Sequence, residues 1–150
     1  MHIKKITTEN DLQVALNIRK SIFIDEQQVP ESEEFDQFDT LQDQCQHVLV
    51  CHENEPVGTG RVRIVDGTGK LERICILKPY RQYGLGKVII RELEKIMQEK
   101  GIAKIKLHGQ TQAEGFYKKL GFQTASDEFM EDGIPHVLMI KKLSLSRDHV

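Results

Sequence analysis

The alternation of hydrophobic and polar residues divides the chain into two parts. In the first part, runs of strand-like composition cover residues 47–51, 56–65 and 71–77, with turn-forming residues between them. Such short connections are typical of antiparallel strands. Residues 3–6 form a further strand candidate, and Thr8 precedes a helical pattern whose acidic first turn suits the helix dipole. We therefore expect a strand, a helix and a three-stranded antiparallel meander.

In the second part the spacing of apolar residues becomes helical. One long amphipathic helix is predicted between a glycine turn and Gly101. Residues 103–107 then alternate as a strand with one buried face, 113–120 form a short helix, and 136–143 form a last strand. A strand, a helix and the next strand in one sheet should be parallel. The fold class is therefore α/β, with a mixed and mostly antiparallel sheet. The apolar residues of the long helix are Leu85, Ile89, Leu93, Ile96 and Met97.

Between the first helix and the meander, residues 25–43 carry eight acidic residues and few apolar ones. We interpret this segment as rich in loops, with room for a short helical piece, and anchored by Phe35 and Phe38. Its acidic residues are expected to form a solvated surface. The alternative is that they attract a cationic amine.

Size and composition limit the classes of function. A chain of 150 residues fits one domain, 1–150, and a net charge of −2 provides no concentrated basic surface for nucleic acid. No apolar stretch is long enough to cross a membrane. The odd set of Cys45, Cys51 and Cys75 contains no CxxC pair, which argues against a disulfide framework or a cysteine zinc site. We therefore expect a cytoplasmic protein without a metal, a nucleic-acid partner or a membrane partner.

The glycine turn before the long helix is the most informative segment. The first backbone N–H groups of a helix lack partners, and glycines let a bulky anion approach them closely, so this turn suits a pyrophosphate. A Walker loop requires Ser or Thr where Val88 follows the lysine, and a dinucleotide fingerprint requires glycine where Ile89 stands. A turn that serves packing alone is the alternative. The residues of the turn are Arg81, Gln82, Tyr83, Gly84, Leu85, Gly86 and Lys87.

These residues carry a resemblance to a known family. Residues 81–86, Arg-Gln-Tyr-Gly-Leu-Gly, resemble the pyrophosphate motif of the GNAT (GCN5-related N-acetyltransferase) family, and Glu72-Arg73-Ile74 stands in the strand that precedes it. Downstream, 115–122 is similar to the FYxxxGF segment of that family. In more detail, the sequence resembles the ElaA-like branch of this family. The residues that carry this resemblance are Arg19, Phe23, Glu26-Gln27, His47, Glu72-Arg73-Ile74, 110–113 before Phe116-Tyr117, and 133–136, Gly-Ile-Pro-His. The resemblance implies the GNAT (acyl-CoA N-acyltransferase) fold, with a central, splayed pair of parallel strands and flanking helices.

The resemblance also implies a donor site for acetyl-CoA. The strand before the motif would offer backbone groups to the pantetheine and acyl carbonyl, and the turn would bind the pyrophosphate mainly through amides. Packing in the core is the alternative for the isoleucines, and the two roles are compatible. The implied cofactor-binding residues are Ile74, Cys75, Ile76, Arg81, Gln82, Tyr83, Gly84, Leu85, Gly86, Lys87 and Phe116.

Acyl transfer to an amine needs a neutral amine, a polarised thioester and a proton for the departing thiolate. Tyr117 matches the family tyrosine near the sulfur of coenzyme A and is the expected general acid. The alternative is an aromatic side chain that only packs. Cys75 is not expected to act as a nucleophile, because no activating partner is evident.

Glu72 is the leading candidate for the general base. Strict alternation places it on the same strand face as Ile74 and Ile76, where it would point into the cleft. An ion pair with a nearby arginine is the alternative. His108 is a second candidate for the base, and His47 and His136 are weaker ones.

These inferences predict an N-acetyltransferase that transfers the acetyl group from acetyl-CoA to a primary amine by direct attack. The amine belongs to a small molecule or to a protein. A non-catalytic acyl-CoA-binding sensor or regulatory module is the first alternative, and a nucleotide-binding protein that uses the glycine turn for ATP is the second. Many GNAT proteins dimerise, so a homodimer is also open.

Overall fold

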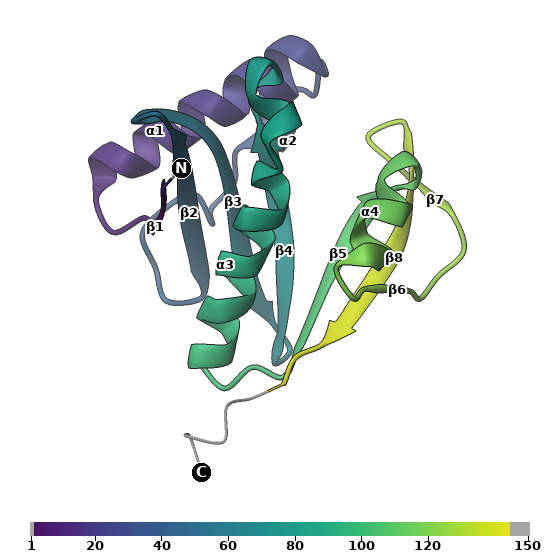
Figure 1. Ribbon diagram of the computed structural model, residues 1–150. Helices are drawn as coiled ribbons and strands as arrows, with labels where there is room; N and C mark the ends of the chain where they lie inside the picture. The colour runs from purple at the N-terminus through teal and green to yellow at the C-terminus, as the bar shows by residue number, and fades with distance from the viewer. Residues whose placement is uncertain (1, 145–150) are drawn as a thin grey trace.

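A computed structural model describes residues 2–144, and its strands join one sheet (Figure 1). The strand order is β1-β2-β3-β4-β5-β8-β6, and β7 pairs with β8. The strands are β1 His2–Lys5, β2 Cys45–His52, β3 Glu55–Val65, β4 Thr68–Ile76, β5 Lys104–Gln110, β6 Gln123–Thr124, β7 Phe129–Glu131 and β8 Ile134–Lys142. The α-helices are α1 Glu9–Arg19, α2 Glu31–Glu34, α3 Leu85–Glu99 and α4 Glu114–Lys119. A π-helical segment, η1 Lys20–Glu26, and two 3-10 helices, η2 Lys78–Tyr83 and η3 Thr111–Ala113, lie between them.

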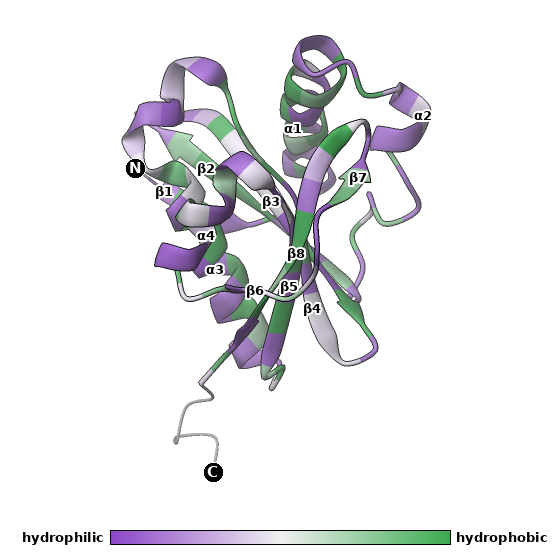
Figure 2. Ribbon diagram, turned by 90° about the vertical axis from the view of Figure 1, so that its right-hand side faces the viewer, coloured by the Kyte–Doolittle hydropathy of each residue, from purple (hydrophilic) through white to green (hydrophobic). Residues whose placement is uncertain are grey.

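The two faces of the sheet pack against different helices. Along β2, Val48 and Val50 belong to the apolar cluster that includes α3, whereas Leu49 belongs to a second cluster with α1. This is the period of two that a strand imposes on its side chains. Viewed along the edge of the sheet, α3 and α4 lie on one side and α2 and β7 on the other (Figure 2). The sheet therefore separates a side with α3 from a side with α2.

The long helix α3 confirms the predicted amphipathic pattern. Leu85, Ile89 and Leu93 are fully buried against the sheet. The helix ends where Gly101 adopts a positive φ of 76°, and the Ile102 amide donates to the Met97 carbonyl at 2.9 Å. A left-handed residue after the last turn is a common helix stop, and glycine adopts it at little cost.

The first helix begins as predicted, but it continues further. The Asp11 amide donates to the Thr8 hydroxyl at 3.2 Å, which caps α1. After Arg19 the chain continues as a π-helical segment, η1, so the helical region extends into the acidic segment. The short helix α2 confirms the helical piece expected within residues 25–43.

Strand β4 contains a bulge that the sequence pattern did not predict. Thr59 pairs with Cys75 but Arg61 pairs with Glu72, so β4 has one extra residue, and Arg73 has a positive φ of 56°. A bulge reverses which face each later residue points to. Before the bulge Leu71 packs on the side with α3, whereas after it Cys75 packs on the side with α1.

Strands β4 and β5 are the parallel pair that was predicted. They pair only over residues 69–71 of β4 and 105–107 of β5, and beyond these residues the strands separate (Figure 1). Strands β6 and β7, which were not predicted, extend the sheet beyond β8. The mixed sheet with a splayed central pair and flanking helices is confirmed.

Candidate active site

A cavity of about 360 Å³ lies where β4 and β5 separate. Its walls come from η1, the bulged part of β4, the end of β5, α4, and the turn between β7 and β8. The cavity therefore lies at the splay and has walls from both sides of the sheet. Its lining includes Glu72, Arg73, His108, Tyr117, Glu131 and His136.

The edge of β4 that faces β5 supplies backbone groups that β5 does not pair with. In the part of the chain that is described, β5 pairs with β4 no further than Leu71, so the next residues offer N–H and C=O groups without a β5 partner. The side chains of Ile74 and Ile76 pack on the α3 cluster at the same time. Both predicted roles of these isoleucines, core packing and an open backbone edge, are therefore compatible in this geometry.

The glycine turn leaves the N-terminus of α3 without a side-chain cap. Gly84 is the N-cap residue, with a φ of 71°, and it makes no capping side-chain bond. Leu85 is buried, so it offers the turn only its backbone, whereas Gln82 and Lys87 are exposed. Tyr83 is half exposed and stacks on the His52 ring at 4.3 Å between centroids. Free amides at a helix N-terminus form a binding site for an anion.

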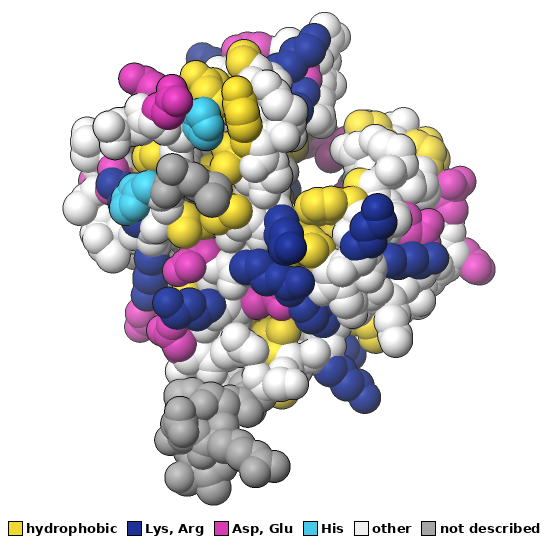
Figure 3. All heavy atoms as spheres, in the orientation of Figure 1, with side chains coloured by type: hydrophobic (Ala, Val, Ile, Leu, Met, Phe, Trp, Pro, Cys, Tyr) yellow, Lys and Arg dark blue, Asp and Glu magenta, His cyan; other side chains and the backbone are white. Residues whose placement is uncertain are grey.

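Basic side chains are exposed along α3 and on α4. Lys87, Arg91 and Lys95 lie on the exposed face of α3, one turn apart, and Lys118 and Lys119 are exposed on α4. Figure 3 shows Lys and Arg side chains gathered on this side of the molecule. Their charges add a favourable field for a phosphate-bearing ligand.

Arg81 lies at the cavity but is held by protein groups. Its guanidinium donates to both carboxylate oxygens of Glu26 at 2.9 Å and to the Ile76 carbonyl at 2.8 Å. The ion pair links η1 to the glycine turn. A pyrophosphate role for Arg81, which the motif implied, therefore needs this side chain to leave Glu26.

Tyr117 lines the cavity from α4. Its ring packs at the edge of Phe116 and Phe122, and a Cβ atom built at Gly109 would come within 3.1 Å of it. Burial raises the pKa of the Tyr117 phenol, so the hydroxyl keeps its proton at neutral pH. Phe116 is partly exposed, and its ring lies 3.5 Å from the position of a Cβ atom at Gly86. Phe116 therefore lies near the first turn of α3, and Tyr117 lies against β5.

The prediction that Glu72 shares a strand face with Ile74 and Ile76 is wrong. Because the bulge at Arg73 intervenes, the Glu72 side chain points to the side of α2 and the two isoleucines to the side of α3. Its carboxylate accepts hydrogen bonds from Arg61 and Arg63 at 3.0 Å and pairs with Lys70 at 3.2 Å. The alternative role, an ion pair with arginine, is therefore the one observed.

These cations make Glu72 a weak proton acceptor. Burial alone would raise the pKa of its carboxyl group, but the hydrogen bond from Arg63 and the charges of Arg61 and Lys70 lower the pKa to about 2. A group with such a pKa binds very little proton at neutral pH.

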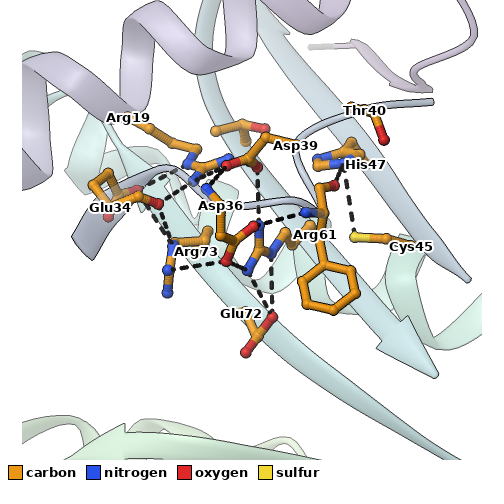
Figure 4. A network of polar contacts seen from close by, with 12 residues as sticks. Arg19, Glu34, Asp36, Asp39, Thr40, Cys45, His47, Arg61, Glu72 and Arg73 are labelled. Carbon is orange, nitrogen blue, oxygen red and sulfur yellow. Dashed lines mark hydrogen bonds and ion pairs between the residues drawn. The ribbon is translucent and has the colours of Figure 1, made fainter. Parts of the chain in front are cut away.

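The acidic segment is part of the same ion-pair network (Figure 4). Glu34 pairs with Arg19 at 2.9 Å, Asp36 pairs with Arg61 at 2.8 Å, and Asp39 pairs with both arginines. Glu34 is 2% exposed, so the expectation of a solvated surface is wrong for these residues. Phe35 and Phe38, the expected anchors, lie against the arginine planes, with guanidinium carbons 4.3–5.9 Å from the ring centroids. The segment is fixed mainly by charge pairing over the sheet.

Two histidines meet at one carboxylate on the side of α2. His108 Nδ1 lies 2.8 Å from one oxygen of Glu131, and His136 Nε2 lies 3.6 Å from the other. His136 Nδ1 donates to the Ile134 carbonyl at 2.7 Å, and Phe129 stacks against the His136 ring. All three polar residues line the cavity. The sequence indicated both histidines but not Glu131, because the strand of Glu131, β7, is only three residues long.

His47 lies away from the cavity at the splay, whereas Cys75 lines that cavity as a neutral thiol. The His47 ring contacts the Phe38 carbonyl at 3.1 Å, and burial lowers its pKa. It borders a different pocket from the one at the splay. Cys75 is buried, and burial raises the pKa of its thiol to about 12, so at neutral pH it is not a thiolate nucleophile.

Two further findings bear on the class of protein. Among residues 2–144, no group of three or more histidine, cysteine, aspartate or glutamate side chains is arranged to hold a metal ion. None of the helices described is both long enough and apolar enough to cross a membrane.

Comparisons with known proteins agree with this geometry. A family model described as an acetyltransferase (GNAT) domain matches residues 17–143. The chain is 70% identical over 144 residues to the uncharacterized protein YyaT of Bacillus subtilis, covering 96% of this chain and 97% of that protein. It is 44% identical over 134 residues to the uncharacterized N-acetyltransferase YjcF of the same organism, covering 89% and 94%.

Solved structures show the same fold. Escherichia coli ElaA matches with a TM-score of 0.82 at 22% identity, covering 93% of this chain and 98% of that one. The PaiA N-acetyltransferase of Thermoplasma acidophilum, solved with coenzyme A, matches with a TM-score of 0.71 at 19% identity, covering 95% and 99%. At these identities the likeness concerns the fold alone.

The chain belongs to the GNAT family of acetyltransferases. It is an acyl-CoA N-acyltransferase, and the resemblance to ElaA that the sequence motifs carried is confirmed at the level of the fold.

Proposed function

We propose that this enzyme transfers the acetyl group of acetyl-CoA to the primary amine of an acceptor by direct attack. One observation carries the proposal: a single cavity at the splay is lined by Tyr117 on α4 and by His108 and His136, whose strands lie beside it. A donor that enters along α3 and an acceptor that enters between α2 and β7 would meet there. Such an arrangement holds the reacting atoms close together, which lowers the entropic cost of reaction.

The donor would be bound mainly by backbone groups. The pyrophosphate would accept hydrogen bonds from the amides that follow Gly84, and the pantetheine would lie along the open edge of β4 at residues 72–76. Each charge-assisted hydrogen bond of this kind contributes about 1.5–3 kcal/mol. Backbone recognition also explains why the turn needs few specific side chains.

The chemistry follows from this placement. The amine nitrogen attacks the thioester carbonyl carbon, the new C–N bond forms, and the C–S bond breaks. The thiolate of coenzyme A takes a proton from the Tyr117 hydroxyl, whose raised pKa keeps it protonated until that step. The proton lost by the amine goes to the histidine pair. A general acid of this kind typically contributes about 10²–10⁴-fold in rate.

We assign the base to the histidine pair and give Glu72 a structural role. The carboxylate of Glu131 holds the His108 ring, and the Ile134 carbonyl fixes the tautomer of His136, as second partners do for catalytic imidazoles. The Glu72 carboxylate has a pKa of about 2 and accepts hydrogen bonds from Arg61 and Arg63.

The cellular location is part of the proposal. All three cysteines are free and buried, which suits the reducing conditions of the cytoplasm. We therefore place the reaction there.

The direct test is calorimetric titration of the purified protein with acetyl-CoA and CoA, with ATP and NAD as controls. We expect both CoA species to bind and the controls not to bind. Amine-dependent release of free thiol from acetyl-CoA then separates an enzyme from a protein that only binds acyl-CoA. Binding of ATP in place of CoA would refute the donor assignment.

The base is tested by separate variants. His108→Asn and His136→Asn should each lower turnover, and the variant that abolishes the acidic limb of the pH–rate profile identifies the proton acceptor. Glu72→Gln should keep that limb while lowering the midpoint of urea unfolding. Loss of the limb in Glu72→Gln alone would return the role of base to Glu72.

A further inference from the structure

Arg73 occupies a backbone conformation that an arginine adopts at a cost. Its φ of 56° lies in the left-handed region, where glycine is favoured and other residues are strained. The bulge in β4 would form more easily with glycine at this position. Strain of this kind often marks a functional site, because the side chain is needed where it stands. The side chain of Arg73 lines the cavity.

The guanidinium of Arg73 is bound less closely than its neighbours. It lies 3.4 Å from the Glu34 carboxylate and 3.7 Å from that of Asp36, and it donates to the backbone carbonyls of Glu34 at 3.3 Å and Glu33 at 3.4 Å. Both carboxylates have nearer partners, since Glu34 lies 2.9 Å from Arg19 and Asp36 lies 2.8 Å from Arg61. Each carboxylate near Arg73 therefore lies closer to another arginine than to Arg73.

The charges of the ion-pair network also single out Arg73. Within the described part of the chain, the network joins five cationic side chains to four carboxylates, which leaves one positive charge in excess. The cations are Arg19, Arg61, Arg63, Lys70 and Arg73, and the carboxylates are Glu34, Asp36, Asp39 and Glu72. Arg73 has the longest ion-pair distances of the five and borders the cavity, so the excess charge is available there (Figure 4).

The β7–β8 part of the cavity wall carries acidic side chains, in contrast to the positive charge of Arg73. Glu131 and Asp132 line the cavity beside His108 and His136. This wall attracts a protonated amine and can accept its proton, whereas Arg73 presents a planar fork that suits a carboxylate.

We propose that the acceptor is a small amine that carries a carboxylate, namely a free amino acid, with its carboxylate on Arg73 and its amine toward the histidine pair. The proposal rests on the acetyl transfer proposed above and specifies its substrate class. A cavity of about 360 Å³ that also receives the acyl end of the donor leaves room for a small acceptor.

The test compares each of the twenty amino acids with the amine that lacks its carboxylate, for example phenylalanine with phenethylamine and lysine with cadaverine. The wild-type enzyme should acetylate at least one amino acid with a kcat/KM at least tenfold above that of its matched amine. Arg73→Gly should lose this preference through a higher KM for the amino acid, and Arg73→Lys should keep part of it, because a lysine provides charge without the fork.

Two measurements separate a binding role from a structural one. Because glycine relieves the positive φ, Arg73→Gly should keep a melting temperature close to that of the wild type. Arg63→Gln is the matched control: it removes a cation from the same network at a residue outside the cavity wall, and it should keep the preference.

The proposal is overturned if no amino acid is acetylated faster than its matched amine, or if Arg73→Gly keeps the preference. Acetylation of amines without such a preference would overturn this proposal and leave the proposed function intact. Failure of acetyl-CoA to bind would instead overturn the proposed function and this proposal together.

Discussion

The two sides of the cavity are built in different ways. On the proposed donor side, the open edge of β4 and the uncapped start of α3 are backbone features of one continuous segment. On the proposed acceptor side, the wall is made of side chains brought together from η1, α2, β4, β5 and the β7–β8 turn. The donor side therefore depends on local conformation, and the acceptor side depends on long-range charge pairing.

This difference matters for how each side tolerates change. A backbone site keeps its shape under most side-chain substitutions, but it is sensitive to residues that alter φ and ψ. A buried ionic network loses much of its stability when one partner is removed, because the remaining charges stay buried without compensation. The two sides should therefore fail under different mutations.

The largest expected effect concerns the tyrosine at the junction of the two sides. Tyr117→Phe should lower kcat by about 10²–10⁴-fold and leave the affinity for acetyl-CoA unchanged, because only the proton donor is removed. Steady-state kinetics and calorimetry measure the two quantities. Tyr80→Phe is the matched control, since Tyr80 lies outside the cavity wall. Equal turnover of Tyr117→Phe and the wild type would remove Tyr117 from the mechanism.

The next effect tests the acceptor side as a network. Arg61 is 1% exposed and serves Asp36, Asp39 and Glu72 together, so Arg61→Met should destabilise the protein by about 3–5 kcal/mol. Urea unfolding gives the free energy. Arg91→Met removes an exposed arginine on α3 and leaves the buried Glu94 paired with Lys141, so it should cost less than about 1 kcal/mol. Similar losses in the two variants would contradict the contrast between the two sides.

The same network predicts how stability depends on pH. Arg61 and its neighbours lower the pKa of Asp36 and of Glu72 to about 2 in the folded protein, against burial. At pH values above their ordinary pKa values, both ionised groups therefore stabilise the folded protein. This stability is lost as the pH falls from about 4.5 toward 2. Each contributes roughly 2–3 kcal/mol. The urea midpoint should fall steeply over this range and less steeply in Glu72→Gln; equal slopes would argue against the role of Glu72 in the network.

The smallest effect concerns the donor turn. Gly84→Val should weaken acetyl-CoA binding by about tenfold, roughly 1.4 kcal/mol, because a β-branched residue disfavours a φ of 71° and shifts the amides at the start of α3. Gly67→Val is the matched control, since Gly67 has a φ of 76°, open space around it, and a position in a turn away from the cavity. Calorimetry should show a loss of affinity in the first variant only. An equal affinity in both would exclude the turn from the donor site.

The contrast also explains how much the sequence predicted. The glycine turn, α3 and the parallel pair were predicted correctly, because periodicity and local motifs encode them. The bulge at Arg73 was missed, since a positive φ at an arginine has no signal in the alternation, and the error moved Glu72 to the wrong face. Glu131 was missed for a related reason: its position depends on pairing between β7 and β8.

The measurement that tests the two-sided account most directly is amide hydrogen exchange with and without acetyl-CoA. We predict that acetyl-CoA slows exchange at residues 72–76 and 84–88 and leaves residues 31–39 and 129–134 unchanged. The donor would then be held by the backbone edge and by the start of α3. Protection at 129–134 without protection at 84–88 would show that the donor binds on the wrong side of the sheet, and would contradict the account.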